Sequence, residues 1–159
     1  MGRMKLMLDT NILVDYLKPR PAFFEPARLL MLCGRLGEFD LWMASSQMTD
    51  LIYILSEGGR KDLMPEVLQS LRGLRQLVDV YPVGPDEAGG MLASPWSDPE
   101  DALLYETALS VGADAIITRD KEGFEESALR AMDCEELFQW LERDFGLAYA
   151  EMALSAQAI

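Results

Sequence analysis

Acidic residues follow two apolar segments that have the length and composition of buried strands. The segment KLML ends at Asp9, and the segment AIIT is followed by Arg119 and Asp120. Asp50 and Asp101 fall near the starts of two segments with helical spacing. A single aspartate after a strand is most often a turn or cap residue. Each acid therefore has an ordinary structural interpretation, whereas all of them at one edge of a sheet would indicate a chemical site.

Grouped carboxylates suit a hard cation, because Mg²⁺ and Mn²⁺ prefer oxygen ligands. Without a cation, such acids repel one another and their pKa values rise. A bound divalent ion relieves that repulsion, activates water and stabilises charge on a phosphoryl oxygen. The sequence has no histidine, which excludes catalytic triads, histidine general bases and histidine-ligated zinc or iron. We therefore predict an oxygen-ligand site for Mg²⁺ or Mn²⁺ that acts on a phosphodiester.

Polar residues flank the acids. We predict that Asn11 and Thr118 support the site, because an amide and a hydroxyl can orient carboxylates or bind a phosphate oxygen. Thr10 or Asn11 would also serve as the N-cap of the following helix. Asp15 is interpreted as a solvated charge, and Arg119 as either a plain surface charge or a member of a basic rim near the pocket.

Short apolar segments alternate with segments of helical spacing. We expect strands at residues 4–8, 40–44, 78–83, 115–118 and 128–132. We expect helices at residues 11–17, 21–37, 47–57, 61–77, 85–94, 99–111 and 134–146. Asp98 before Pro99 predicts an N-cap, which places Asp101 in the first turn of its helix. The alternation predicts a parallel sheet with helices on both faces, where functional residues gather at the carboxyl ends of the strands.

The composition limits the domain count and the partners. The 159 residues fit one domain at 1–145, with a C-terminal extension at 146–159 that is helical or disordered. The net charge of −13 argues against strong nonspecific binding to nucleic acid. Cys33 and Cys134 are predicted to be buried free thiols. No signal peptide or membrane-spanning stretch is recognisable, so a cytoplasmic protein without membrane contact is expected.

Segments of the chain, taken in order, resemble the PIN-domain family, including the VapC-type ribonuclease toxins. The matching segments are LDTNILVDYL, SSQMTDLIYIL, DPEDALLYETALSVGADAIITRD and KEGF. The resemblance implies a three-layer α/β/α sandwich with a mainly parallel central sheet. It also implies an Mg²⁺- or Mn²⁺-dependent ribonuclease acting on RNA, a homodimer, and an antitoxin as a possible partner protein.

The resemblance assigns roles to single residues. It implies that Asp9, Asp101 and Asp120 are metal ligands, and that Asp50 completes the catalytic set. Many family members carry a glutamate at the Asp50 position, so direct coordination by this shorter acid is less expected than contact through water. An acid at all four positions favours an active enzyme.

Two alternatives remain open from the sequence. A metal-dependent phosphatase could use a strand-end aspartate as phosphoryl acceptor, but the second aspartate of that signature is replaced by Asn11. A catalytically weak interaction module could use the acidic crevice to receive a basic segment of a partner.

Overall fold

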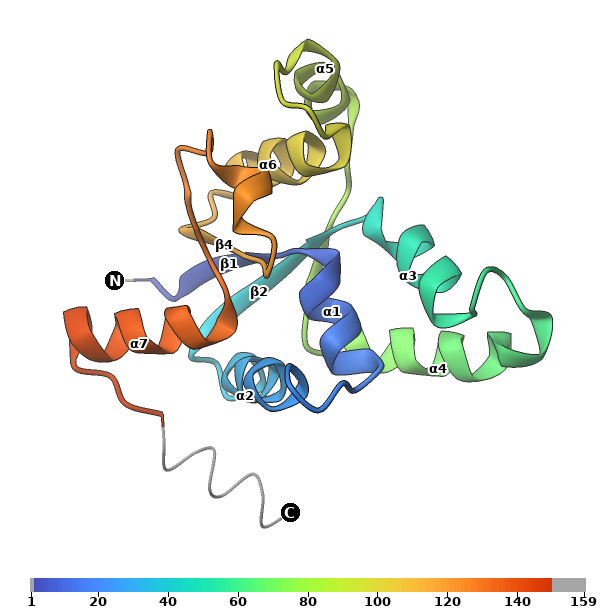
Figure 1. Ribbon diagram of the computed structural model, residues 1–159, viewed down its shortest axis with the longest axis horizontal. Helices are drawn as coiled ribbons and strands as arrows, with labels where there is room; N and C mark the ends of the chain where they lie inside the picture. Colours follow the sequence, from blue (N-terminus) through green and yellow to red (C-terminus); the bar gives the residue numbers. More distant parts are fainter. Residues whose placement is uncertain (1, 150–159) are drawn as a thin grey trace.

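A computed structural model describes residues 2–149 of the chain, and it contains one sheet of five parallel strands (Figure 1). The strands are β1 (Met4–Leu8), β2 (Phe39–Ala44), β3 (Asp79–Tyr81), β4 (Ala115–Ile117) and β5 (Arg130–Met132). Their order across the sheet is β3-β2-β1-β4-β5. In the register, Leu6 of β1 lies opposite Leu41 of β2 and Ala115 of β4. The predicted parallel sheet is confirmed.

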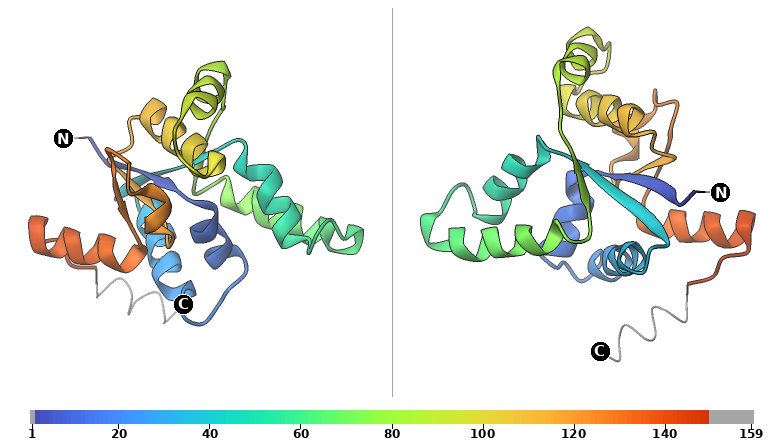
Figure 2. Two further views of the ribbon diagram at one scale, coloured as in Figure 1. Left: turned by 45° about the horizontal axis from the view of Figure 1, so that its top comes forward. Right: turned by 180° about the vertical axis from the view of Figure 1, so that it is seen from behind.

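Helices cover both faces of this sheet. They are α1 (Thr10–Leu17), α2 (Phe24–Arg35), α3 (Gln47–Leu55), α4 (Met64–Leu74), α5 (Pro85–Ala93), α6 (Pro99–Val111) and α7 (Cys134–Phe145), with 3₁₀ turns η1 (Lys61–Leu63) and η2 (Lys121–Phe124). In Figures 1 and 2, α1, α2 and α7 lie on one face and α5 and α6 on the other, while α3 and α4 extend outward from the sheet. The predicted α/β/α sandwich is confirmed. The expected helix at 61–77 is divided into η1 and α4, and the helix expected at 21–37 begins only at Phe24.

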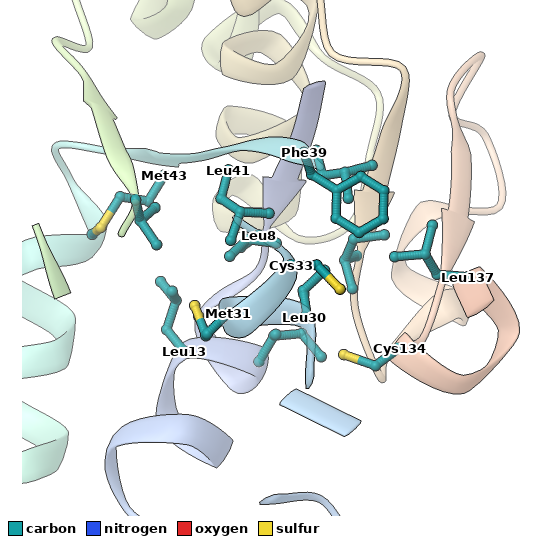
Figure 3. Packing of buried hydrophobic residues seen from close by; sticks show 14 of the residues in the cluster. Leu8, Leu13, Leu30, Met31, Cys33, Phe39, Leu41, Met43, Cys134 and Leu137 are labelled. Carbon is teal, nitrogen blue, oxygen red and sulfur yellow. The ribbon is translucent and has the colours of Figure 1, made fainter. Parts of the chain in front are cut away.

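The layers are held together by two apolar cores. The larger core lies between the sheet and α1, α2 and α7 and includes residues of α3 and α4. Figure 3 shows side chains of this core from the strands and from α1, α2 and α7. The smaller core joins Met7 and Ile116 of the sheet to Leu104, Ala108 and Phe124. Neighbouring residues of a strand point to opposite faces. Strand β1 is therefore apolar along its buried length, because both of its faces are covered.

Caps fix the ends of α6 and α7. The Asp98 carboxylate accepts from the backbone N–H groups at the start of α6, as predicted, and Gly112 ends that helix with a φ of 72°. Gly146, with a φ of 65°, ends α7. The structure describes residues 146–149 of the expected C-terminal extension. Among them, Tyr149 is buried against Phe39 and Phe138. Residues 150–159 lie outside the described part of the chain.

The strand order reverses between β1 and β4, and a crevice lined by Asp9 and Ala44 opens beside this point, at the carboxyl ends of β1 and β2. The chain moves outward from β1 to β2 and β3, and then returns to add β4 and β5 on the other side. In open α/β sheets, ligands bind at this reversal, beyond the carboxyl ends of the strands. The backbone N–H of Asp9 donates to the carbonyl of Ile117 over 2.9 Å, so the two strand ends lie side by side. Among residues 2–149, no helix has the length and apolarity needed to cross a membrane.

Candidate active site

Asp9 stands at the end of β1 and is the N-cap of α1. Its carboxylate accepts from the Thr10 backbone N–H at 2.7 Å, from the Thr118 hydroxyl at 2.8 Å and from the Asn11 amide at 3.3 Å. The acid therefore caps the helix, so the ordinary interpretation is confirmed for Asp9. Its role as a metal ligand stays a prediction.

Burial raises the pKa of Asp9 above its ordinary value of 3.8. The hydrogen bonds from Thr118 and Thr10 oppose that rise, because they stabilise the charged form. The negative charges of Asp120 and Asp98 add to it. Hydrogen-bond donors therefore stabilise the charged form of Asp9, whereas burial and the nearby negative charges destabilise it.

Thr118 and Asn11 connect the ends of β1 and β4. The Thr118 side chain is fully buried, and its oxygen donates to Asp9 and accepts from the backbone N–H of Asp120 at 3.0 Å. The Asn11 amide donates to Thr118 at 3.3 Å, and its carbonyl oxygen accepts from the backbone N–H of Arg119 at 3.2 Å. The two predicted supporting residues therefore lie beside Asp9 and also tie down the segment that carries Asp120.

Asp101 approaches from α6, on the opposite face of the sheet from α1. It lies in the first turn of α6, where the Asp98 cap fixes the backbone. Burial raises the pKa of Asp101 to about 7, and the charges of Asp98, Asp9 and Asp120 contribute to the rise. Asp101 is therefore close to half protonated at neutral pH in the absence of a cation.

An open pocket of about 430 Å³ adjoins these acids. Asp9, Asp101 and Asp50 line it, with Asp50 in the first turn of α3. Asp120, at the start of η2, does not line this pocket, but its charge acts on both Asp9 and Asp101. The structure therefore places three of the predicted acids in one pocket and the fourth within electrostatic reach of two of them.

Glu100 is an acid of this pocket that sequence reasoning missed. Burial and the charges of Asp50, Asp98 and Asp9 raise its pKa. Its position next to Asp101 in the first helical turn was the available signal.

Gln47 was also missed, and nothing in the sequence distinguishes it. It is buried, and its side chain accepts from the Ala44 N–H at 2.7 Å and donates to the Leu8 carbonyl at 2.9 Å and the Thr10 hydroxyl at 3.1 Å. This residue therefore fastens the end of β2 to the end of β1, next to Asp9.

Two interpretations of charged residues were wrong. Asp15 is not solvated: its side chain is 2% exposed and pairs with Arg119, with nitrogen–oxygen distances of 2.7 and 3.1 Å. Arg119 also lies over the Phe23 ring, 4.1 Å from its centroid. Arg119 is thus turned toward α1 and is not part of a basic rim. The signal was the three-residue spacing from buried Ile12, which places Asp15 on the inner face of α1.

The donor chemistry fits a hard divalent cation. The ligands available at the crevice are carboxylate oxygens, with hydroxyl and amide oxygens behind them. The Asp101 carboxylate lies in the space beside Gly123 that a side chain there would fill, and the Asp120 carboxylate lies near the same space. Within residues 2–149, no three acidic or thiol side chains already stand in a metal-binding arrangement. Coordination would therefore require these carboxylates to turn toward a shared ion.

A family model described as PIN domain matches residues 5–122. No curated protein matches the chain by sequence. The fold is similar to that of DNA-bound VapBC from Salmonella typhimurium, with a TM-score of 0.62 and 23% identity, over 82% of this chain and 98% of that one.

Two further solved structures are similar. VapBC-1 from nontypeable Haemophilus influenzae gives a TM-score of 0.60 at 21% identity, over 83% of this chain and 99% of that one. VapBC2 from Rickettsia felis, bound to a promoter DNA fragment, gives a TM-score of 0.59 at 15% identity, over 82% of this chain and 98% of that one. At these identities the similarity establishes the fold.

Proposed function

The chain belongs to the PIN-domain family, and from this premise we propose that it is a metal-dependent endoribonuclease that hydrolyses RNA phosphodiester bonds. The observation that supports the proposal is the presence of Asp9 and Asp101 in one pocket, with the charge of Asp120 acting on both of them. These acids come from three elements, and the charges of Asp9 and Asp120 raise the pKa of Asp101 in the absence of a cation.

The residues have distinct roles in this proposal. Asp9, Asp101 and Asp120 would hold Mg²⁺ or Mn²⁺, which when bound supplies an activated water and stabilises phosphoryl charge. Thr118 and Asn11 hold the Asp9 carboxylate in one orientation through their hydrogen bonds.

Asp50 of α3 and Glu100 of α6 also line the pocket. We assign Asp50 the role of orienting the attacking water, because its side chain is one methylene shorter than the glutamate found in many relatives. Glu100 adds negative charge beside it. That charge favours a cation and disfavours an RNA phosphate that arrives without one.

The substrate is proposed to be a structured RNA, such as tRNA or rRNA. A chain with a net charge of −13 is repelled by a uniform polyanion, so recognition has to come from a limited contact surface. Arg119 does not provide a free phosphate contact, because it is paired with Asp15.

The test is cleavage of total RNA by the purified protein with Mg²⁺ or Mn²⁺, with EDTA, and with Asp9→Asn. We expect discrete cuts that EDTA and the substitution abolish, with sequenced ends that map to one RNA class. Asp62→Asn, which removes an exposed acid that does not line the pocket, serves as the control and should cleave normally. Cleavage that survives both EDTA and Asp9→Asn would overturn the proposal.

An antitoxin partner and a homodimer belong to the same proposal. The similar solved structures are described as VapBC complexes, and an arginine from a partner could pair with the acids of the pocket. The protein should form a stable complex with the product of an adjoining small reading frame, and RNA cleavage should fall in that complex. Absence of a complex would contradict the toxin–antitoxin assignment and leave the nuclease test unaffected.

A further inference from the structure

We propose that Gly123 is a positioning residue of the metal site, where the absence of a side chain leaves room for the Asp101 carboxylate to lie against η2, near Asp120. The inference rests on the proposed function, since it concerns the ion that these acids would share. Gly123 is the third residue of η2, in the turn that directly follows Asp120.

The contact is steric and specific. A Cβ placed on Gly123 would overlap Asp101 Oδ2, and would lie 3.2 Å from Asp101 Cγ and 3.4 Å from Asp120 Oδ2. The Asp101 carboxylate therefore occupies the space that a side chain at 123 would fill, and the Asp120 carboxylate lies at ordinary contact distance from the same space.

Backbone conformation does not account for glycine at this position. Gly37 and Gly112 have φ values of 80° and 72°, which favour glycine for conformational reasons. Gly123 is not among the glycines with positive φ. Alanine could adopt its backbone, so space is what restricts the position.

The backbones on the two sides of the contact are held in place, which leaves the Asp101 side chain as the part that can move. The Asp101 backbone is fixed by the Asp98 cap at the start of α6. On the other side, Phe124 follows Gly123 in η2, is buried in the smaller core and packs edge-on against Trp96 at a centroid distance of 5.9 Å. A methyl group at 123 would therefore be accommodated by rotation of the Asp101 carboxylate away from Asp120.

The test is calorimetric titration of Mn²⁺ into wild type, Gly123→Ala and Gly73→Ala. Gly73 is a matched control, because it lies inside α4, has no positive φ and has nothing within 4 Å of an added Cβ. We expect the dissociation constant for Mn²⁺ to rise about 10- to 100-fold in Gly123→Ala, the usual effect of disturbing residues behind metal ligands. Gly73→Ala should bind like wild type.

The outcomes separate the two proposals. If wild type binds Mn²⁺ and Gly123→Ala binds it equally well, this inference is wrong and the proposed function stands. If wild type binds no divalent ion, the proposed function itself fails.

If Gly123→Ala does not fold in the wild-type background, the same substitution is made in the Asp101→Ala variant and the melting temperatures are compared. Asp101→Ala removes the carboxylate that the methyl group would strike, so Gly123→Ala should be tolerated in that background, with the melting temperature of Asp101→Ala. Loss of folding in both backgrounds would contradict the steric contact.

Discussion

Burial and the neighbouring acids Asp98, Asp9 and Asp120 raise the pKa of Asp101 to about 7, from an ordinary value of 3.8. Between these two values the folded chain binds more protons at this residue than the unfolded chain. The stability that Asp101 contributes is therefore fully present below about pH 3.8 and is lost as the pH rises through about 7.

This pH dependence of the stability contributed by Asp101 gives a prediction for the metal-free protein. In EDTA, Asp101→Asn should gain stability relative to wild type as the pH rises from about 4 to about 8, because the variant has no charge to develop. Urea denaturation of both proteins at the two pH values measures the difference. A free-energy difference that does not change with pH would contradict the raised pKa of Asp101.

Thr118 gives a second prediction for a single side chain. Thr118→Val keeps the shape but removes the hydroxyl that donates to Asp9 and accepts from the Asp120 N–H. RNA cleavage should fall about 10- to 100-fold, and the free energy of unfolding should fall by about 1 kcal/mol.

Thr107→Val is the matched control for this substitution. Thr107 is equally buried, but its hydroxyl donates to the Leu103 carbonyl of its own helix at 2.8 Å. The control should retain full cleavage. Equal loss in the two variants would show that Thr118 acts through general packing and not through Asp9.

Among the elements, α1 and the segment after β4 are fastened together by Asp15 and Arg119. The Arg119 side chain is held by Asp15, and its backbone N–H donates to the Asn11 side chain. Together these bonds fix the backbone between Thr118 and Asp120. Positioning of Asp120 thus depends on a helix that precedes it by more than a hundred residues.

Asp15→Asn tests this fastening. Removing one partner of a buried pair typically costs about 3–5 kcal/mol, and the lower end applies here because Arg119 is 29% exposed. The exposed pair of Arg60 and Asp62 is the control, and Asp62→Asn should change stability by less than about 1 kcal/mol. Urea denaturation measures both. Similar small losses in both variants would contradict a stabilising role for the Asp15 pair.

The order of elements could be predicted from the sequence, and with it the edge where the acids gather. That prediction needed only the alternation of strands and helices and the rule that parallel strands share a carboxyl edge. Partners at long range could not be predicted in the same way. The pairing of Asp15 with Arg119 and the bridging by Gln47 depend on how the strand ends lie in space, which local patterns do not encode.

At the scale of the whole molecule, the acids occupy the reversal point of the β3-β2-β1-β4-β5 sheet. Helices from both faces contribute: α1 carries Asn11, and α6 carries Asp101. The account therefore makes one central claim, that Asp9, Asp101 and Asp120 share a divalent ion at this point.

The most direct test is anomalous diffraction from crystals of the protein soaked in Mn²⁺. We expect an anomalous peak beside the reversal between β1 and β4, within coordination distance of carboxylate oxygens of Asp9, Asp101 and Asp120. Crystals of Asp101→Asn, soaked in the same way, should show a weakened peak or none. A crevice without a peak in the wild type, or Mn²⁺ bound only at other acids of the surface, would contradict the account.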